Sequence, residues 1–128
     1  MVPALLLLLL AAPVAAQPAA PVPELRIFAD GFPAGAWDVA AGAGPPRRHM
    51  LRDPSALLFA GRAPAAGCRV TVVADTPARA VLTWSCPGGD SGRSEIRRDH
   101  AGLYVVQAQG VAGRLPFATQ SEFRRVGD

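Results

Sequence analysis

Residues 68–86 read CRVTVVADTPARAVLTWSC, and this stretch holds both cysteines of the chain. A turn sequence around Pro77 interrupts two runs of apolar and β-branched residues, which predicts an antiparallel hairpin. With the turn centred on Pro77, the opposed residues are Cys68 and Cys86, Val70 and Trp84, and Val72 and Leu82. All six side chains then share one face, which we expect to be the core face of a sheet.

The two cysteines, Cys68 and Cys86, are expected to form a disulfide in an oxidising compartment. Closing a loop of about 19 residues contributes on the order of 3 kcal/mol in the chain-entropy model. Such a covalent link suits a chain of 128 residues with 13 Gly and 13 Pro. A chain of this length and composition buries only a small core and forms one domain.

Downstream of the hairpin, a second one is expected from residues 93–98 and 103–108, joined by the turn Asp-His-Ala-Gly at 99–102. Residues 117–126 alternate well enough to form a last strand, with Phe117 and Phe123 on one face. Tyr104 is expected in the core because large apolar residues are scarce in this chain.

Upstream, Leu25 and Ile27 predict a short strand that begins near Glu24, and Trp37 and Val39 predict a second one. Trp37 is expected in the core. Residues 53–61 predict a single short helix, capped by an aspartate, with a proline at its first position and a glycine at its exit. Its buried side is expected to carry Leu57, Leu58 and Phe59.

Short strands separated by glycine-containing turns favour a mainly β fold. We expect an antiparallel meander that forms a curved sheet or an incomplete barrel and carries one short helix. The sequence leaves open whether the sheet encloses a cavity for a ligand or is filled by its own aromatic side chains.

The amino-terminal residues predict export. Six leucines at 5–10 lead into Ala-Ala-Pro-Val-Ala-Ala, which is typical of a signal peptide covering residues 1–16. Residues 17–23 form a Pro/Ala-rich leader, and residues 24–128 form a single β-rich domain. The apolar run is too short to span a bilayer as a helix, so we expect a periplasmic or extracellular protein without a transmembrane span in its mature form.

Ser91 lies in Gly-Asp-Ser-Gly at 89–92, which matches the tetrapeptide around the nucleophile of chymotrypsin-like proteases. That fold needs about twice this length, and His49 lacks the family's Ala-Ala-His-Cys setting. Asp-Ser-Gly is also a common turn sequence, and we favour the turn. The two histidines, His49 and His100, show no metal-ligand spacing, so no metal or cofactor is expected.

The candidate anion-binding residues come in three adjacent pairs. They are Arg47 with Arg48, Arg97 with Arg98, and Arg124 with Arg125. One interpretation is weak contact with anionic envelope components. The other, which we favour, is that the formal net charge of +3 only solvates the surface, because every basic residue is arginine, as codon bias would produce. Nucleic acid is not an expected partner, because an exported protein rarely meets it.

Several short motifs recur in a family of small exported bacterial proteins of unknown function, which this chain resembles. The motifs are Gly35-Ala36-Trp37, then Cys68 with Trp84-Ser85-Cys86, and Arg124-Arg125-Val126-Gly127-Asp128. Two family cysteines are missing here, one expected near Met50 or Leu51 and one at the carboxyl terminus. The resemblance implies that these two pair with each other and that Cys68 pairs with Cys86. It implies no catalytic residues.

We therefore expect an exported, non-enzymatic binding or accessory protein of the cell envelope, with ligand and partner unknown. The main alternative is an inhibitor of a secreted hydrolase such as lysozyme, which would insert an exposed loop at residues 88–93 into the enzyme's cleft. A further alternative is a minimal hydrolase that uses Ser91.

Overall fold

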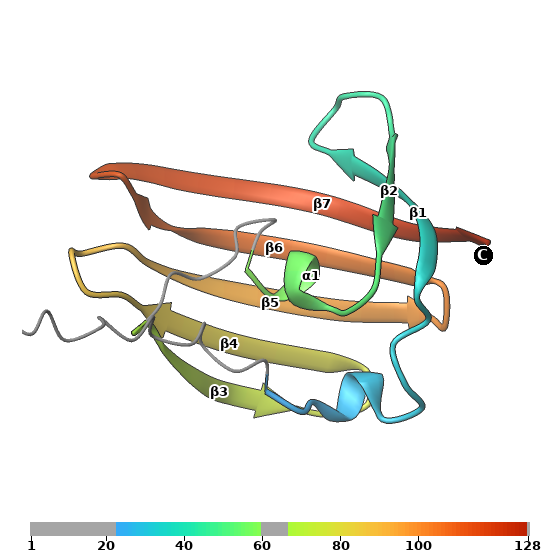
Figure 1. Cartoon of the computed structure of the whole chain (residues 1–128), viewed down its shortest axis with the longest axis horizontal. Helices are drawn as coiled ribbons and strands as arrows, with labels where there is room; N and C mark the ends of the chain where they lie inside the picture. Colours follow the sequence, from blue (N-terminus) through green and yellow to red (C-terminus); the bar gives the residue numbers. More distant parts are fainter. Residues whose placement is uncertain (1–22, 60–66, 128) are drawn as a thin grey trace, which may run out of the picture.

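In a computed structural model, which describes residues 23–59 and 67–127, the chain forms one antiparallel sheet (Figure 1). Its seven strands lie in the order β2-β1-β7-β6-β5-β4-β3. The strands are β1 (Gly35–Ala41), β2 (Arg47–Leu51), β3 (Arg69–Asp75), β4 (Arg79–Ser85), β5 (Ser91–His100), β6 (Leu103–Ala112) and β7 (Leu115–Gly127). The predicted signal peptide, residues 17–22 of the leader and the helix exit at Gly61 lie outside the described residues.

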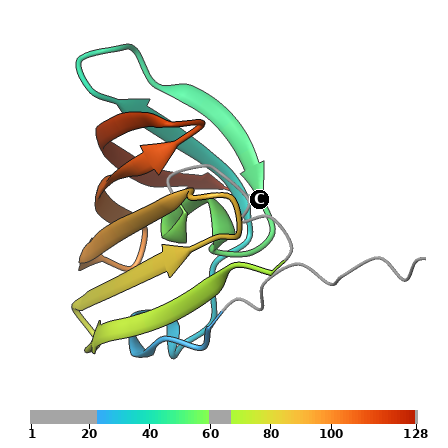
Figure 2. The ribbon, with the colours of Figure 1, turned by 90° about the vertical axis from the view of Figure 1, so that its left-hand side faces the viewer.

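The expected fold class is confirmed. Strands β3 to β7 form a meander in which each strand pairs with the next, and β1 then pairs with β7. The outermost strands, β2 and β3, do not pair with each other, so the sheet is open and not a closed barrel. Figure 2 shows the sheet curving around the short helix α1 (Ser55–Leu58).

The hairpin of β3 and β4 has the predicted register. Val70 pairs with Trp84 and Val72 with Leu82, until a bulge after Val72 shifts the register by one residue. Cys68 and Cys86 form the expected disulfide, with an S–S distance of 2.08 Å. The bulge lies in an edge strand, where such irregularities protect the sheet from pairing with other chains.

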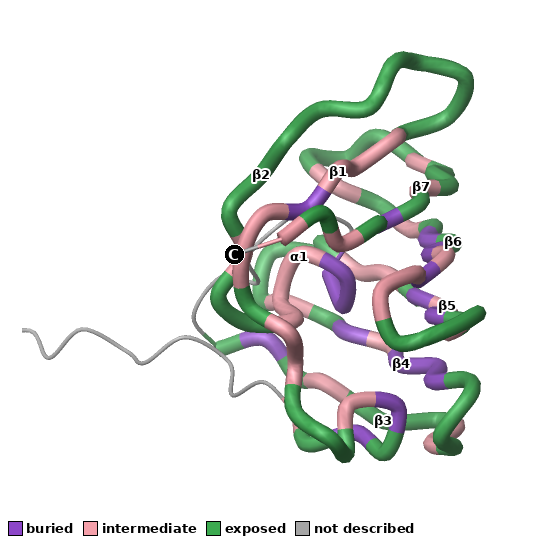
Figure 3. Tube along the Cα trace, turned by 90° about the vertical axis from the view of Figure 1, so that its right-hand side faces the viewer, coloured by how far each residue is buried: buried purple, intermediate pink, exposed green. Residues whose placement is uncertain are grey.

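The core lies between the concave face of the sheet, here called the inner face, and the segments that cover it. Buried side chains alternate along β5 and β6, whereas β4 carries three consecutive buried residues, Ala80 to Leu82, as the purple segments of Figure 3 show. The core cluster consists of Leu25, Ile27, Trp37, Leu57, Leu58, Phe59, Ala80, Leu82, Trp84, Ile96, Tyr104, Val106 and Phe123. The concave side is therefore filled by the protein's own side chains.

Most of the expected core residues are in place, with one correction. Four of them are buried in the core cluster, namely Trp37, Trp84, Leu82 and Phe123. Two more, Val70 and Phe117, are partly buried and pack against this cluster. Val72 is instead 40 % exposed. Leu82, its partner in β4, is fully buried. Val72 is more exposed because β3 is an edge strand and no further strand lies beyond it.

The prediction of a strand at Leu25 and Ile27 is wrong. This segment forms the 3-10 helix η1 (Arg26–Phe28), in which Phe28 N donates to Leu25 O at 3.0 Å. Leu25 and Ile27 are both buried, so the alternation of apolar residues predicts their burial correctly but not their secondary structure. The backbone of Arg26 is held by the Asp75 carboxylate at 2.7 Å, a tertiary contact that no local pattern predicts.

The predicted helix is confirmed as the single turn α1, in which Leu57 and Leu58 are buried as expected, as is Phe59 directly after it. Pro54 was expected at the first helical position but lies one residue earlier, at the N-cap. Asp53 accepts a hydrogen bond from Ser55 N at 2.9 Å and one from the Ser55 hydroxyl, and these bonds lower the pKa of its carboxyl group. No helix within residues 23–59 or 67–127 has the length and apolarity of a membrane span.

The sequence prediction missed strand β2. Four of its five residues are exposed, so it lacks the apolar alternation that marks a strand. It pairs with β1 across the turn at residues 42–46, with Trp37 opposite His49.

Candidate anion-binding pocket

In each of the three arginine pairs, the geometry of the strand separates one member from the other. Adjacent residues in a strand point to opposite faces, so the two members of a pair point apart. Arg98 lies opposite Tyr104 and shares its inner face, while Arg97 points to the opposite, outer face. In β7, Arg125 lies opposite Trp37 and is in phase with the buried Phe123.

The outer members are paired with carboxylates. Arg48 Nε lies 3.1 Å from Asp38 Oδ1, Arg97 Nε lies 3.0 Å from Asp99 Oδ1, and Arg124 Nη2 lies 3.1 Å from Glu122 Oε1. All three arginines are exposed, as is Arg47 at the start of β2. Arg48, Arg97 and Arg124 thus lie on different strands with their counter-charges beside them, so they form no continuous cationic patch.

Arg98 and Arg125, by contrast, line the same pocket. It lies beside the turn from β5 to β6 and has a volume of about 450 Å³. Figure 1 shows this turn at the right-hand end of the sheet. Its lining residues are Ile27, Asp30, Gly31, Pro33, Arg98, Ala101, Gly102, Tyr104, Arg125 and Val126. Two guanidinium groups from strands that are not neighbours are thus brought to one hollow beside an aromatic ring.

The backbone holds both arginines in place. Arg98 N donates to Ala78 O at 2.9 Å, and Arg125 N donates to Gly102 O at 2.8 Å. The Arg125 side chain is fixed further, since its Nη2 donates to Ala34 O at 3.0 Å. A guanidinium fixed in this way loses little freedom when it binds a ligand.

Arg98 is the less satisfied of the two. Its Nε is buried and has no hydrogen-bond partner, and the side chain forms no ion pair with a described carboxylate. Leaving a buried donor unpaired costs about 1–3 kcal/mol, and more for a charged group. Since this Nε is closed to solvent, an anion in the pocket would meet the charge of the Arg98 guanidinium and not this N–H group.

Tyr104 is one of the residues that line the pocket, although it was expected to serve the core. It does both, because it is 2 % exposed and also lines the pocket. Its ring packs against Phe28 and Trp37, with centroid distances of 5.4 and 5.9 Å. Burial raises the pKa of the phenol, the nearby Arg98 opposes this rise, and Asp30 adds to it.

Ser91 lies at the start of β5, opposite Ser85 and Val111. His100 lies at the other end of the same strand, about 30 Å away at 3.3–3.4 Å per residue. His49 lies in the edge strand β2, with β1, β7 and β6 between it and β5. The described residues therefore provide Ser91 with no histidine that can act as a general base.

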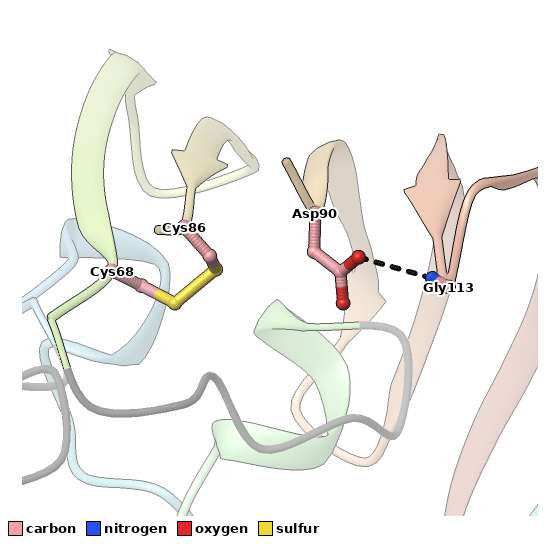
Figure 4. Close-up of a disulfide and its surroundings, with 4 residues drawn as sticks. All are labelled: Cys68, Cys86, Asp90 and Gly113. Carbon is pink, nitrogen blue, oxygen red and sulfur yellow. Dashed lines mark hydrogen bonds between the residues drawn. A yellow bond between two sulfur atoms is a disulfide. The ribbon is translucent and has the colours of Figure 1, made fainter. Parts of the chain in front are cut away.

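The turn between β4 and β5 is exposed and tightly held. Cys86 N donates to Asp90 O at 2.8 Å, and Gly113 N donates to Asp90 Oδ1 at 3.0 Å. Figure 4 shows this second bond beside the Cys68–Cys86 disulfide. The loop predicted at residues 88–93 is shorter than expected, since residues 91–93 already belong to β5.

The part of the chain that the structure describes contains no group of three or more His, Cys, Asp or Glu residues that could hold a metal ion. A scan against protein-family models, a search of curated proteins and a search of solved structures each found no match to this chain.

Both arginines of the pocket are recognisable as candidates in the sequence, but their convergence is not. The signal was present, because Arg98 continues the phase of Ser94 and Ile96, and Arg125 continues that of Phe123. Asp30 gave no signal, because its position depends on the path of the segment around η1.

Proposed function

We propose that the protein is an exported, non-enzymatic binding protein of the bacterial cell envelope, and that it holds a compact anionic group of its ligand between Arg98 and Arg125. The observation that carries this proposal is that Arg98 and Arg125, from two strands that are not neighbours, line one pocket beside Tyr104. The anion is a carboxylate or a phosphate, because both accept hydrogen bonds from the planar guanidinium fork.

Export is supported by the signal-peptide pattern at residues 1–16, and the partly buried disulfide is compatible with an oxidising compartment. The resemblance to small exported bacterial proteins agrees with a location in the periplasm or outside the cell.

The filled concave face supports surface recognition over enclosure of an apolar ligand. The pocket places one positively charged side chain on each side of Tyr104 and one carboxylate, Asp30, at the same hollow. Its net charge therefore favours a singly or doubly charged group of small size.

The test is a titration of the ¹⁵N-labelled protein with inorganic phosphate and, separately, with acetate, followed by NMR of the arginine Nε–H signals. We expect the Arg98 and Arg125 signals to shift with saturation. Arg98→Lys keeps the charge but loses the planar fork, so it should bind at least about tenfold more weakly.

Arg97→Gln is the matched control, because Arg97 neighbours Arg98 in the chain but points to the outer face and pairs with Asp99. This variant should bind both anions as the wild type does. Equal binding by wild type and Arg98→Lys would contradict the proposed site.

A second candidate function, inhibition of a secreted hydrolase, is favoured by the held turn at residues 87–90. A turn fixed by a disulfide and by the Asp90 carboxylate loses little entropy when it enters a cleft. Capture of a hydrolase such as lysozyme that is lost when the turn is replaced by a shorter one would support this role. Capture that survives the replacement would remove it.

A further inference from the structure

A second hollow lies on the outer face of the sheet and runs across its strands. It is a wide, open groove of about 600 Å³ with contributions from β3, β4, β5, β6 and β7. Its lining residues are Arg69, Thr71, Thr83, Trp84, Ser85, Ser91, Gly92, Arg93, Gln109, Gly110, Val111, Phe117 and Ala118. At 4.7–4.9 Å between strands, five strands give a groove about 19 Å long.

The register explains the shape of this outer groove. One row of paired residues, Trp84, Gly92, Gly110 and Phe117, forms its floor. The side chains of this row point to the inner face, while the residues before and after them in each strand point outward and form the two walls.

Two floor positions require glycine. A Cβ atom at Gly92 would lie 2.0 Å from Trp84 Cζ2, and one at Gly110 would lie 2.1 Å from Ser91 O. The Trp84 ring takes the space on the inner side of Gly92 and is 8 % exposed. The aromatic ring therefore supports the floor from below and offers no stacking platform in the groove.

The charge of the groove is positive. Its two ionisable residues are Arg69 and Arg93, and none of the described residues that line it is acidic. Arg69 forms no ion pair with another described residue. Arg93 Nη1 lies 3.8 Å from Glu95 Oε2, but Glu95 is held more closely by Arg79, whose Nε lies 3.0 Å from Glu95 Oε1.

The two guanidinium groups belong to positions that are far apart. Arg69 pairs with Ser85, which pairs with Ser91, two residues before Arg93. Two strand spacings across and two residues along give about 12 Å between the backbone positions. One compact anion cannot bridge this distance easily, whereas an extended chain with repeated anionic groups can contact both arginines.

The space between the arginines is lined by uncharged hydrogen-bonding groups. These are the hydroxyl groups of Thr71, Thr83, Ser85 and Ser91 and the amide of Gln109. Hydroxyl and amide groups both donate and accept hydrogen bonds, as sugar hydroxyls do.

We propose that this outer groove binds an extended acidic oligosaccharide, with carboxylates of the sugar chain on Arg69 and Arg93 and sugar hydroxyls on the polar side chains between them. A single-stranded nucleic acid would need exposed aromatic faces on which bases stack, but both aromatic residues of the floor, Trp84 and Phe117, pack against the core on the inner face. This binding does not depend on the Arg98–Arg125 pocket, which opens elsewhere on the molecule and takes a compact anion.

The experiment is a titration of the whole protein with a defined oligogalacturonate, followed by NMR and by calorimetry. We expect backbone signals of Thr83, Ser91 and Gln109 to shift, and the double variant R69Q/R93Q to bind at least about tenfold more weakly. The fully methyl-esterified oligogalacturonate, which has the same chain without its charges, should bind weakly to the wild type.

Arg97→Gln removes one positive charge on the same face but outside the groove, and it should keep the wild-type affinity. Arg98→Gln should also keep it, which separates this proposal from the one for the pocket. Unchanged affinity in R69Q/R93Q, equal binding of the esterified chain, or tighter binding of a single-stranded oligonucleotide at the same residues would overturn the proposal.

Discussion

The Arg98–Arg125 pocket and the outer groove use the same residue type in two different ways. In the pocket, two arginines converge beside a buried tyrosine, and one guanidinium nitrogen is buried without a partner. In the groove, two exposed arginines stand about 12 Å apart with hydroxyl groups between them. The comparison indicates that spacing and burial, rather than the number of positive charges, decide which kind of anion each region can bind.

Three exposed arginines outside the two regions show the effect of a neighbouring carboxylate. Arg48, Arg97 and Arg124 each lie beside a carboxylate of the same strand or a neighbouring one. Exposed ion pairs contribute little to stability, but they do remove the positive charge that an anionic ligand would meet. In the pocket and in the outer groove, by contrast, two arginines meet at most one carboxylate, Asp30 in the pocket and Glu95 beside the groove.

The largest expected effect comes from removing the disulfide. The double variant C68S/C86S should lower the free energy of unfolding by about 3 kcal/mol, as measured by urea denaturation. Because Arg69 follows Cys68 in the edge strand β3, the outer groove should lose more affinity than the pocket. Reduction of the wild type should reproduce the change, and unaltered stability would contradict the role given to this bond.

The next effect concerns the floor of the groove. Gly92→Ala should lower the free energy of unfolding by about 1–3 kcal/mol, because the new methyl group must displace the Trp84 ring. Thermal unfolding and Trp fluorescence measure the two consequences. Gly44→Ala is the control, since a Cβ there would meet only Ala41 O at 3.4 Å. Equal stability of the two variants would show that the floor is not closely packed.

A smaller effect is expected at a buried polar side chain that lines neither the pocket nor the outer groove. Ser94 is fully buried in the core face, and its hydroxyl has no hydrogen-bond partner. Ser94→Ala should therefore raise the free energy of unfolding by about 1 kcal/mol and leave anion binding unchanged in both regions. A stability loss on this substitution would mean that the hydroxyl is satisfied in solution.

The smallest effect is a dependence on pH. The hydrogen bond and charge of Arg79 lower the pKa of Glu95 below its ordinary value of 4.5. The contribution of this pair is present above that value and is lost as the pH falls through the lower pKa of the folded state. In Glu95→Gln this acid-dependent part should disappear, with a change of less than about fivefold in the folding equilibrium constant.

The same variant tests the groove, because Glu95 is the carboxylate nearest to Arg93. Oligogalacturonate should bind Glu95→Gln more tightly than the wild type, while phosphate binding at the pocket should not change. A weaker interaction with the oligosaccharide would count against the charge argument.

Much of the fold could be predicted because the register and burial of a strand are visible in the pattern of its own apolar residues. In the hairpin from Cys68 to Cys86, apolar alternation and the cysteine positions agreed on one register. The pattern failed where tertiary contacts decide the backbone, as at η1, where Leu25 and Ile27 are buried without being in a strand. It also failed at β2, whose exposed residues carry no apolar signal.

The candidate sites were less predictable, for a related reason. The phase of a strand places Arg98 and Arg125 on the inner face, but only the order of strands in the sheet brings them to one pocket. Arg69 and Arg93 are isolated in the sequence, and only the pairing of β3, β4 and β5 places them along one groove.

The most direct test of the pocket uses Tyr104, the single tyrosine of the chain, as a probe. Ultraviolet titration of the folded protein should give a phenol pKa above the ordinary 10.0, and phosphate should raise it further by offsetting the charge of Arg98. In Arg98→Gln the pKa should be higher than in the wild type and no longer respond to phosphate. A tyrosine that titrates at its ordinary value, or a pKa that phosphate leaves unchanged in the wild type, would contradict an anion site at this pocket.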